Sequence, residues 1–317
     1  SYNKITEASL IYLTHIYTLQ TLNLAQNPVT IFGSEMDIYP KTVSTQLHKL
    51  YLDRCDDLYL LSFYFTEFLH QAKNLVDISI GFNNPNNLDT IKGLLNWVRD
   101  NNQLKSLHLP CLSKLEPLSD DFILAIYNML KENKSLEHLN LTNNNLKDQS
   151  IKIMLALRHN NSLTSLNLRG NEIDDTHLSF LLQAYNENPE FNIQELNLFD
   201  NKVHEQGVNY LCEILTLKEI NLRANPAFLP ENHKLMQLPK IESLTIDYVN
   251  YNSNSTGQFV TQAEQCNSLK SLTFFTRMIP TIELRIPSIL SINSNIEQIR
   301  YYGFGNKLNI LSSLLLN

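Results

Sequence analysis

A nine-residue phrase, LxxLxLxxN, returns from one end of the chain to the other and limits the possible folds more than any other feature of the sequence. Clean copies begin at Leu19, Leu136, Leu163, Ile193 and Leu217. Weaker copies fill the gaps and begin at Leu47, Leu75, Leu104, Ile241, Leu269 and Ile296. Successive starts lie 24 to 32 residues apart. Such a period predicts a repeat architecture in which each unit buries its apolar residues against its neighbours.

The phrase has a physical explanation. Its central residues alternate between apolar and polar, which is typical of a short strand with one buried face. The ninth residue turns the chain out of the sheet, and an Asn amide there can bond backbone groups that the strand end leaves unpaired. Position nine is occupied by Asn27, Asn83, Asn144, Asn171, Asn201 and Asn225, with Cys55 as a substitute. Because Val249, Arg277 and Phe304 hold this position in the last three repeats, we expect those repeats to be less regular.

The residues between successive phrases leave room for a helix of about 10 to 12 residues. Apolar spacing predicts helices over 88–99, 148–157 and 175–185, and over 119–132 with Ser119 as the N-cap. Alternation of strand and helix predicts a parallel sheet. Because strands lie about 4.8 Å apart and packed helices about 8 to 10 Å, the array should bend into a horseshoe. The predicted fold class is α/β, a repeat solenoid with a concave parallel sheet and a mostly helical convex side.

Three departures from regularity set the expected organisation. Pro226, Pro230 and Pro239 argue against a full helix in the repeat that begins at Leu217. Apolar residues within 1–18 predict an N-terminal capping helix, followed by one continuous array over 19–304. Leu308, Leu311 and Leu315 fall at helical spacing, so 305–317 is predicted to be a helical cap or the start of a further segment.

The repeated phrase, extended to LxxLxLxxNxL and followed by a helix, resembles leucine-rich-repeat proteins, and within them the ribonuclease-inhibitor-like subfamily with helical convex sides. The likeness covers roughly 19–304. It implies a non-enzymatic scaffold that recognises a protein partner through its concave face. Alternatives are a GTPase-activating or other enzyme-regulating protein, and the recognition domain of a longer multidomain effector. The abundant Asn and mixed repeat lengths are also similar to leucine-rich-repeat effectors that intracellular bacteria inject into host cells.

Composition excludes several classes of protein. A formal net charge of -7 and a pI near 5.7 disfavour nucleic acid as a partner. The longest apolar stretches fall well short of the ~20 residues that span a bilayer, so no membrane span is expected. The four cysteines are far apart and form no CxxC, which favours a reducing compartment. We therefore expect an intracellular, cytoplasmic monomer or, for a bacterial effector, secretion into the host cytoplasm. Sequons at Asn133, Asn140, Asn160 and Asn254 are attributed to the high Asn content.

The predicted strand register places positions three, five and seven of each phrase on the concave face and position eight on its rim. Arg and aromatic residues, which dominate protein interface hot spots, gather there from the sixth repeat onward. The predicted partner-binding residues are Arg169, Phe199, Asp200, Arg223, Asp247, Tyr248, Phe275, Arg300 and Tyr302. The alternative is that Phe199 and Phe275 pack on each other or on neighbouring side chains. Position five carries a row of Asn residues, which either bonds a peptide backbone or is merely solvated.

The sequence contains no GxSxG, P-loop, HExxH or GxGxxG motif, so we expect no enzyme, no catalytic residues and no cofactor. His108, Cys111 and His138 fall on neighbouring strands and are the best remaining candidates for a soft metal or a Cys and His pair. Chance placement among nine histidines is sufficient to explain them, and we predict no metal site.

Overall fold

The computed structural model describes residues 16–27, 46–54, 62–81, 88–112, 118–226, 234–248, 261–276, 286–302 and 307–311. The chain divides into two compact units. The first comprises Ser1–Leu166 with Asn188–Asn192, and the second comprises Asn167–Glu187 with Ile193–Asn317. The expected continuous array over 19–304 stays a prediction.

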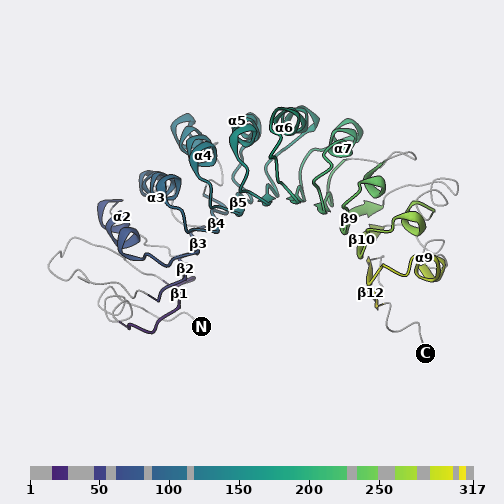
Figure 1. Cartoon of the computed structure of the whole chain (residues 1–317), viewed down its shortest axis with the longest axis horizontal. Coiled ribbons are helices and arrows are strands. Elements are labelled where there is room, and N and C mark those ends of the chain that lie inside the picture. Colours follow the sequence, from purple (N-terminus) through teal and green to yellow (C-terminus); the bar gives the residue numbers. More distant parts are fainter. Residues whose placement is uncertain are drawn as a thin grey trace. The chain divides into compact units, whose positions relative to one another are not determined.

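The first unit is a parallel sheet covered on one face by helices (Figure 1). Its strands, in the order of the chain, are β1 (Thr21–Asn23), β2 (Lys49–Tyr51), β3 (Asp77–Ser79), β4 (Ser106–His108) and β5 (His138–Asn140). Strand β6 (Ser165–Asn167) lies at the boundary of the units. The helices are α2 (Ser62–Gln71), α3 (Leu88–Asp100), α4 (Asp120–Glu132) and α5 (Ser150–Ala156), with 3-10 turns η2 (Lys147–Gln149) and η3 (Leu157–His159).

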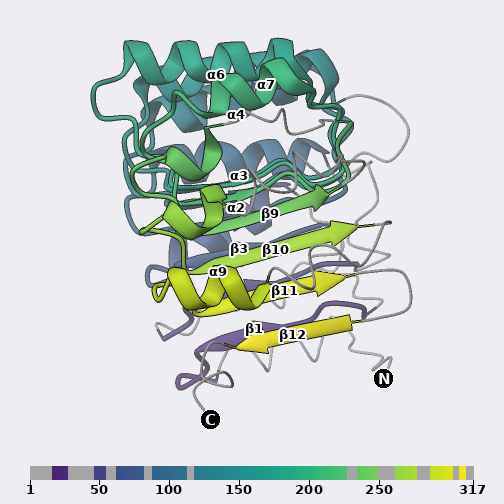
Figure 2. The same cartoon turned by 90° about the vertical axis from the view of Figure 1, so that its right-hand side faces the viewer.

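The second unit repeats this arrangement. Strands β7 (Glu195–Asn197), β8 (Glu219–Asn221), β9 (Ser243–Tyr248), β10 (Ser271–Thr276) and β11 (Gln298–Tyr302) are parallel. Strand β12 (Lys307–Leu311) runs antiparallel to β11, and Figure 2 shows β9 to β12 side by side in the order of the chain. The helices are α6 (Asp175–Glu187), α7 (Glu205–Leu211) and α9 (Ile286–Ile292), with the 3-10 turn η4 (Leu235–Gln237).

Within each unit, the strand register places position four of the phrase in a buried row. Leu50 pairs with Leu22 and Ile78 in the first unit, and Leu244 pairs with Ile220 and Leu272 in the second. These six residues are at most 5 % exposed. Since successive strand residues point to opposite faces, positions three, five and seven lie on the face opposite the helices, which we call the open face.

Asn residues at position nine form the predicted ladder between repeats. Asn201 is 7 % exposed, and its Nδ2 donates to the carbonyls of Leu168 and Leu198 at 3.0 Å. Its Oδ1 accepts from the N–H groups of Asn171 and Ile173 at 3.0 and 2.9 Å. Asn225 likewise donates to the carbonyls of Leu198 and Leu222 in two adjacent repeats, and such buried backbone groups would otherwise lack partners. Asn27 in the first repeat donates only to Leu24 and Ala25 of its own repeat, within the described residues.

The structure also contains a second Asn ladder that sequence reasoning missed. Asn133 follows α4, is 1 % exposed and donates to the carbonyls of Val98 and Asn101 at 2.6 and 2.7 Å. One repeat later, Asn160 likewise donates to the backbone carbonyls of Leu130 and Asn133. The available signal was an Asn three residues before the first Leu of the phrase. Because both amides are buried and bonded, the sequons at Asn133 and Asn160 are inaccessible in the folded chain.

Most helix predictions are confirmed. Helices α3, α4 and α6 cover the predicted spans, and the Ser119 hydroxyl accepts from the N–H of Phe122 at 3.3 Å as the N-cap of α4. The span 148–157 is divided among η2, α5 and η3. In the Pro-rich repeat, Leu235–Gln237 form the single turn η4, and residues 227–233 lie outside the described part.

The end predictions fare differently. Residues 307–311 form strand β12, so the predicted helix is wrong there: β12 bonds the last parallel strand through backbone groups, and sheet pairing overrides the helical spacing. The expected N-terminal helix lies mostly outside the described residues, and 16–18 form a turn. The last repeats are less regular, as predicted. Strands β9 and β10 are six residues long, whereas the earlier strands have three.

Candidate partner-binding face

Position seven of the phrase forms one row across the open face of the second unit. The row follows the strand register, in which Phe275 of β10 lies opposite both Asp247 of β9 and Tyr302 of β11. Its described members are Arg169, Phe199, Arg223, Asp247, Phe275 and Tyr302, which we call the ladder. The structure thus brings together six of the nine predicted residues.

Stacking holds the ladder together. The guanidinium carbon of Arg169 lies 4.4 Å from the centroid of the Phe199 ring, and that of Arg223 lies 5.1 Å from the same centroid. Arg223 also stacks on Phe275 at 3.6 Å. Phe275 and Tyr302 are parallel, with centroids 4.4 Å apart and planes 6° apart. Each cation and ring pair contributes about 0.5 to 1 kcal/mol at an exposed site, so several together restrain the side chains. The alternative prediction is that Phe199 packs on neighbouring side chains, and its ring does contact Arg169 and Arg223.

Asp247 fixes the central arginine. Its Oδ1 lies 3.8 Å from Nε of Arg223, and its Oδ2 accepts the N–H of Ala224 at 2.6 Å. The Arg223 side chain remains 42 % exposed and that of Asp247 remains 25 % exposed. The ladder is therefore ordered in advance and still accessible, which lowers the entropy cost of binding a partner.

The Asn row at position five has a structural role that sequence reasoning missed. The Oδ1 atoms of Asn167, Asn197 and Asn221 accept the N–H groups two residues later, at 3.1, 3.0 and 3.1 Å. Those N–H groups belong to the position-seven residues of the ladder. Each Asn therefore forms a turn that fixes the backbone of a ladder residue. The sequence signal is the short side-chain amide two residues before position seven.

The other three predicted residues lie around the ladder. Asp200 is exposed at position eight and has φ 58°, and Arg300 is exposed in β11 opposite Thr273. Tyr248 lies opposite Thr276 in the register of β9 and β10, and its side chain is outside the described part. No stacking contact joins Asp200 or Arg300 to the ladder within the residues that the structure describes.

A pair of carboxylates lies at the beginning of the same strands. Glu195 and Glu219 occupy position three and face each other in the register of β7 and β8. Burial raises the pKa of Glu219, and the negative charges of Glu195 and Glu242 raise it further. The open face of the second unit therefore has a carboxylate pair at the strand starts, whereas the strand ends combine arginine and aromatic rings with Asp200 and Asp247.

The open face of the first unit carries a different polar network. The Tyr51 hydroxyl donates to Asp77 at 2.7 Å, and Nε2 of His108 lies 3.5 Å from the other Asp77 oxygen. Burial and the bond to Asp77 raise the pKa of Tyr51 to about 12. Burial lowers the pKa of His108, although the nearby Asp77 and Asp53 oppose this shift. The hydrogen bond from Tyr51 joins β2 to β3, whereas the Asp77 oxygen that faces His108 has no hydrogen-bond partner within the described residues.

The structure does not support the soft-metal candidate. His108 faces Asp77, while Cys111 is 6 % exposed in the turn after β4, with φ 53°. Within the described ranges, no group of three His, Cys, Asp or Glu side chains is placed to bind a metal.

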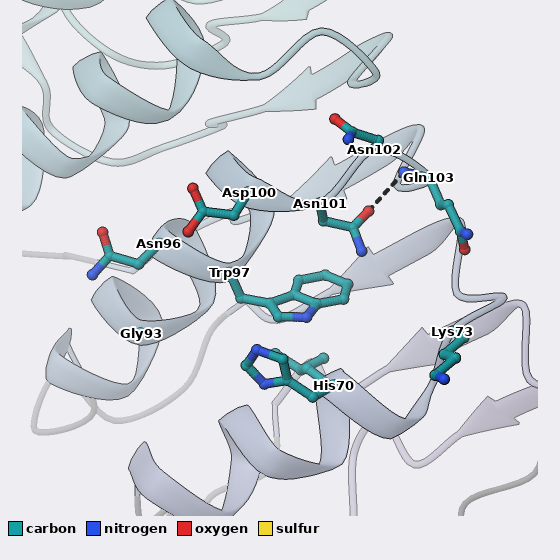
Figure 3. Close-up of a pocket in the computed structure, with 10 residues that line it drawn as sticks. His70, Lys73, Gly93, Asn96, Trp97, Asp100, Asn101, Asn102 and Gln103 are labelled. Carbon is teal, nitrogen blue, oxygen red and sulfur yellow. Dashed lines mark hydrogen bonds between the residues drawn. The ribbon is translucent and has the colours of Figure 1, made fainter.

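A pocket of about 640 Å3 lies between α2 and α3 and was not predicted. Figure 3 shows the indole of Trp97 between His70 and Asn101. Trp97 is 7 % exposed, and Asn101 Oδ1 already accepts the N–H groups of Gln103 and Leu104 at 2.8 Å. Asp100 is bonded to the Arg99 guanidinium. Because its polar groups serve the local turn, this pocket is a weaker candidate than the ladder.

Comparisons with known proteins give limited matches. The family described as Leucine Rich repeat matches residues 132–152 and 159–181. The tropomodulin C-terminal domain of Caenorhabditis elegans is 14% identical, covers 56% of this chain and 94% of its own, and has a TM-score of 0.36. Leiomodin-1 Actin-Binding Site 2 is 14% identical, with 57% and 92% covered and a TM-score of 0.35. No curated protein matches.

None of the helices in the described ranges is long and apolar enough to span a membrane. The described cysteines Cys111, Cys212 and Cys266 are free thiols. Parallel strands covered by helices, the Asn ladder at position nine and the two matched repeat segments together identify the fold as an α/β leucine-rich-repeat solenoid.

Proposed function

We propose that this chain is a non-enzymatic scaffold that binds a protein partner through the open, concave face of its second unit. The observation that carries this proposal is the ladder, in which exposed guanidinium and aromatic groups are held in one row. Arg and aromatic side chains are the commonest hot spots of protein interfaces. The described part has no comparable row of catalytic groups, and the polar residues of the ladder serve stacking and ion pairing.

Finer assignments belong to the same proposal. Helices α3, α4 and α6 have thirteen residues each, which supports the ribonuclease-inhibitor-like subfamily with its helical convex side. Free thiols in the described part support a reducing, intracellular location and a monomer without disulfide links. The high Asn content of the sequence supports a bacterial effector acting in the host cytoplasm. These four assignments do not depend on the ladder.

The test removes the centre of the ladder. The double variant Arg223→Ala with Phe275→Ala should lose capture of the cytosolic partner, identified by mass spectrometry with the native chain. Its thermal stability should change little because both side chains are partly exposed. The double variant Lys202→Ala with Leu215→Ala, on exposed side chains away from the ladder, is the control and should retain capture. Unchanged capture by the ladder variant would show that the partner binds elsewhere.

Regulation of a partner enzyme, such as a small GTPase, is the alternative within the same class of scaffold. A position next to the partner's catalytic groups would let a rigid row of arginines organise them. Turnover assays of the captured partner, with and without the chain, separate this alternative from binding alone.

A further inference from the structure

We propose that the segment Asn167–Asn225 receives an acidic stretch of the partner protein, with its carboxylates placed between the Asn row and the ladder arginines. The inference rests on the proposed function and specifies the chemistry of the partner. Three repeats carry it, and each supplies one Asn at position five.

The Asn row presents hydrogen-bond donors. Oδ1 of Asn167, Asn197 and Asn221 is already bonded to the backbone, which fixes which end of each amide faces outward. In the described part of the chain, none of the three Nδ2 groups has a hydrogen-bond partner. An occupant that satisfies this row must supply acceptor oxygens.

The arginines beside the row have the same preference. Arg169 is exposed and stacks on Phe199, and within the described residues it forms no ion pair. Arg223 meets Asp247 through Nε at 3.8 Å. A guanidinium has five N–H donors and no acceptor, so its remaining donors match carboxylate oxygens. Amide and guanidinium donors thus lie on two adjacent rows.

The spacing of these rows suits carboxylates on an ordinary chain. Adjacent strands lie about 4.8 Å apart, so the three Asn residues span about 10 Å. Position seven lies two residues beyond position five, which is about 6.6 Å along the strand. Acidic side chains on successive turns of a helix, or on alternate residues of a strand, are about 5 to 7 Å apart. Two or three of them can therefore reach both rows together.

The Glu pair limits where the acidic stretch can lie. Glu195 and Glu219 occupy position three of β7 and β8, on the other side of the Asn row from the ladder. Their charge repels further carboxylates from the strand starts. The exposed Asp200 at position eight repels carboxylates in the same way on the far side of the ladder. The acidic stretch is therefore confined to the band between positions three and eight, where the donors are.

The test uses a fluorescent oligoglutamate of about twelve residues, long enough to cross three strands. Oligolysine of the same length and a single-stranded oligonucleotide serve as the comparison probes, and anisotropy measures binding. We expect oligoglutamate to bind at least about tenfold tighter than either probe, and to weaken with added salt because charges are paired. Glu195→Gln should tighten its binding, since the repulsion is reduced.

Asn197→Asp is the decisive variant. An Asp at this position still accepts the N–H of Phe199, so the turn and the thermal stability are retained, but its donors are replaced by a negative charge. Oligoglutamate binding should fall about tenfold or more. The matched control is Asn23→Asp, which makes the same change at position five of the first repeat, where Oδ1 accepts the N–H of Ala25 at 3.0 Å. This control should bind as the native chain does.

Equal effects of the two Asp variants, or oligoglutamate binding no tighter than oligolysine, would overturn the inference. So would an oligonucleotide that binds as tightly as oligoglutamate, because the face would then attract any polyanion. Partner capture distinguishes this failure from failure of the proposed function. If Arg223→Ala with Phe275→Ala abolishes capture while Asn197→Asp leaves it intact, the binding face stands and the acidic partner does not.

Discussion

The guanidinium carbon of Arg223 lies 3.6 Å from the centroid of the Phe275 ring, although the two residues belong to repeats separated by a third. The intervening repeat contributes Asp247, which lies opposite Phe275 and holds Nε of Arg223 at 3.8 Å. Asp247 cannot stack on a ring and would interrupt the ladder. The Arg223 side chain is long enough to extend past Asp247 and stack on Phe275, so the ladder remains continuous.

This contact predicts a measurable coupling. Arg223→Met, Phe275→Leu and their double variant form a thermodynamic cycle, and unfolding in urea should give a coupling of about 0.5 to 1 kcal/mol. The same cycle for Arg223 and Phe199, at 5.1 Å, should give a smaller value. If the loss of unfolding free energy in the double variant equals the sum of the losses in the two single variants, the stack contributes nothing to stability.

The Asn ladder predicts a large loss from a single side chain. Asn201→Ala leaves the buried N–H groups of Asn171 and Ile173 and the carbonyl of Leu168 without this partner. The free energy of unfolding in urea should fall by about 2 to 4 kcal/mol. Asn161→Ala is the control, because Asn161 is exposed and bonded to Glu190, and its effect should stay within about 0.5 kcal/mol. A comparable loss of unfolding free energy in both variants would contradict the structural role of the Asn residues at position nine.

Position eight predicts a stabilising substitution. This position adopts the left-handed conformation in successive repeats, with φ 65° at Gly170, 58° at Asp200 and 56° at Ala224. Glycine has no Cβ and therefore avoids the steric cost of this conformation, which outweighs the greater entropy that glycine has in the unfolded chain. Ala224→Gly should therefore stabilise the folded state by about 0.5 kcal/mol. Ala184→Gly, within α6, should instead destabilise by about 1 kcal/mol or more. Thermal denaturation of both variants checks the opposite signs.

The Glu pair predicts a pH effect with a definite sign. The pKa of Glu219 is raised from its usual 4.5 by burial and like charge, so the folded state binds its proton more tightly than the unfolded state does. The resulting penalty is absent below the unfolded pKa and complete above the folded one. Glu219→Gln should therefore raise the melting temperature at pH 7 and have less effect at pH 4.

Glu242 gives the contrasting control. Lys270 lowers the pKa of Glu242 through a hydrogen bond of 2.6 Å, so its small contribution is present above pH 4.5 and lost as the pH falls through the folded pKa. Glu242→Gln loses the bond to Lys270 and should stabilise less than Glu219→Gln at pH 7. A Glu219→Gln variant that matches Glu242→Gln at neutral pH would contradict the assigned cause.

Much of the candidate site could be predicted because the strand period is two. Once Leu196 and Leu198 are buried, Asn197 and Phe199 must face the opposite way, and the same holds in the neighbouring repeats. What the period could not show is the contact between Arg223 and Phe275, which depends on side-chain rotamers across three strands. It also could not show that Asn197 bonds the backbone of Phe199.

The sequence by itself determined the repeat, the buried row of leucines and the Asn ladder, because each follows from local spacing that recurs at a fixed period. Tertiary structure decided the strand at 307–311, where backbone pairing with β11 outweighed helical spacing. It also decided which position-seven side chains meet. Those contacts depend on the distance between strands and on the reach of each side chain, and neither is encoded within one repeat.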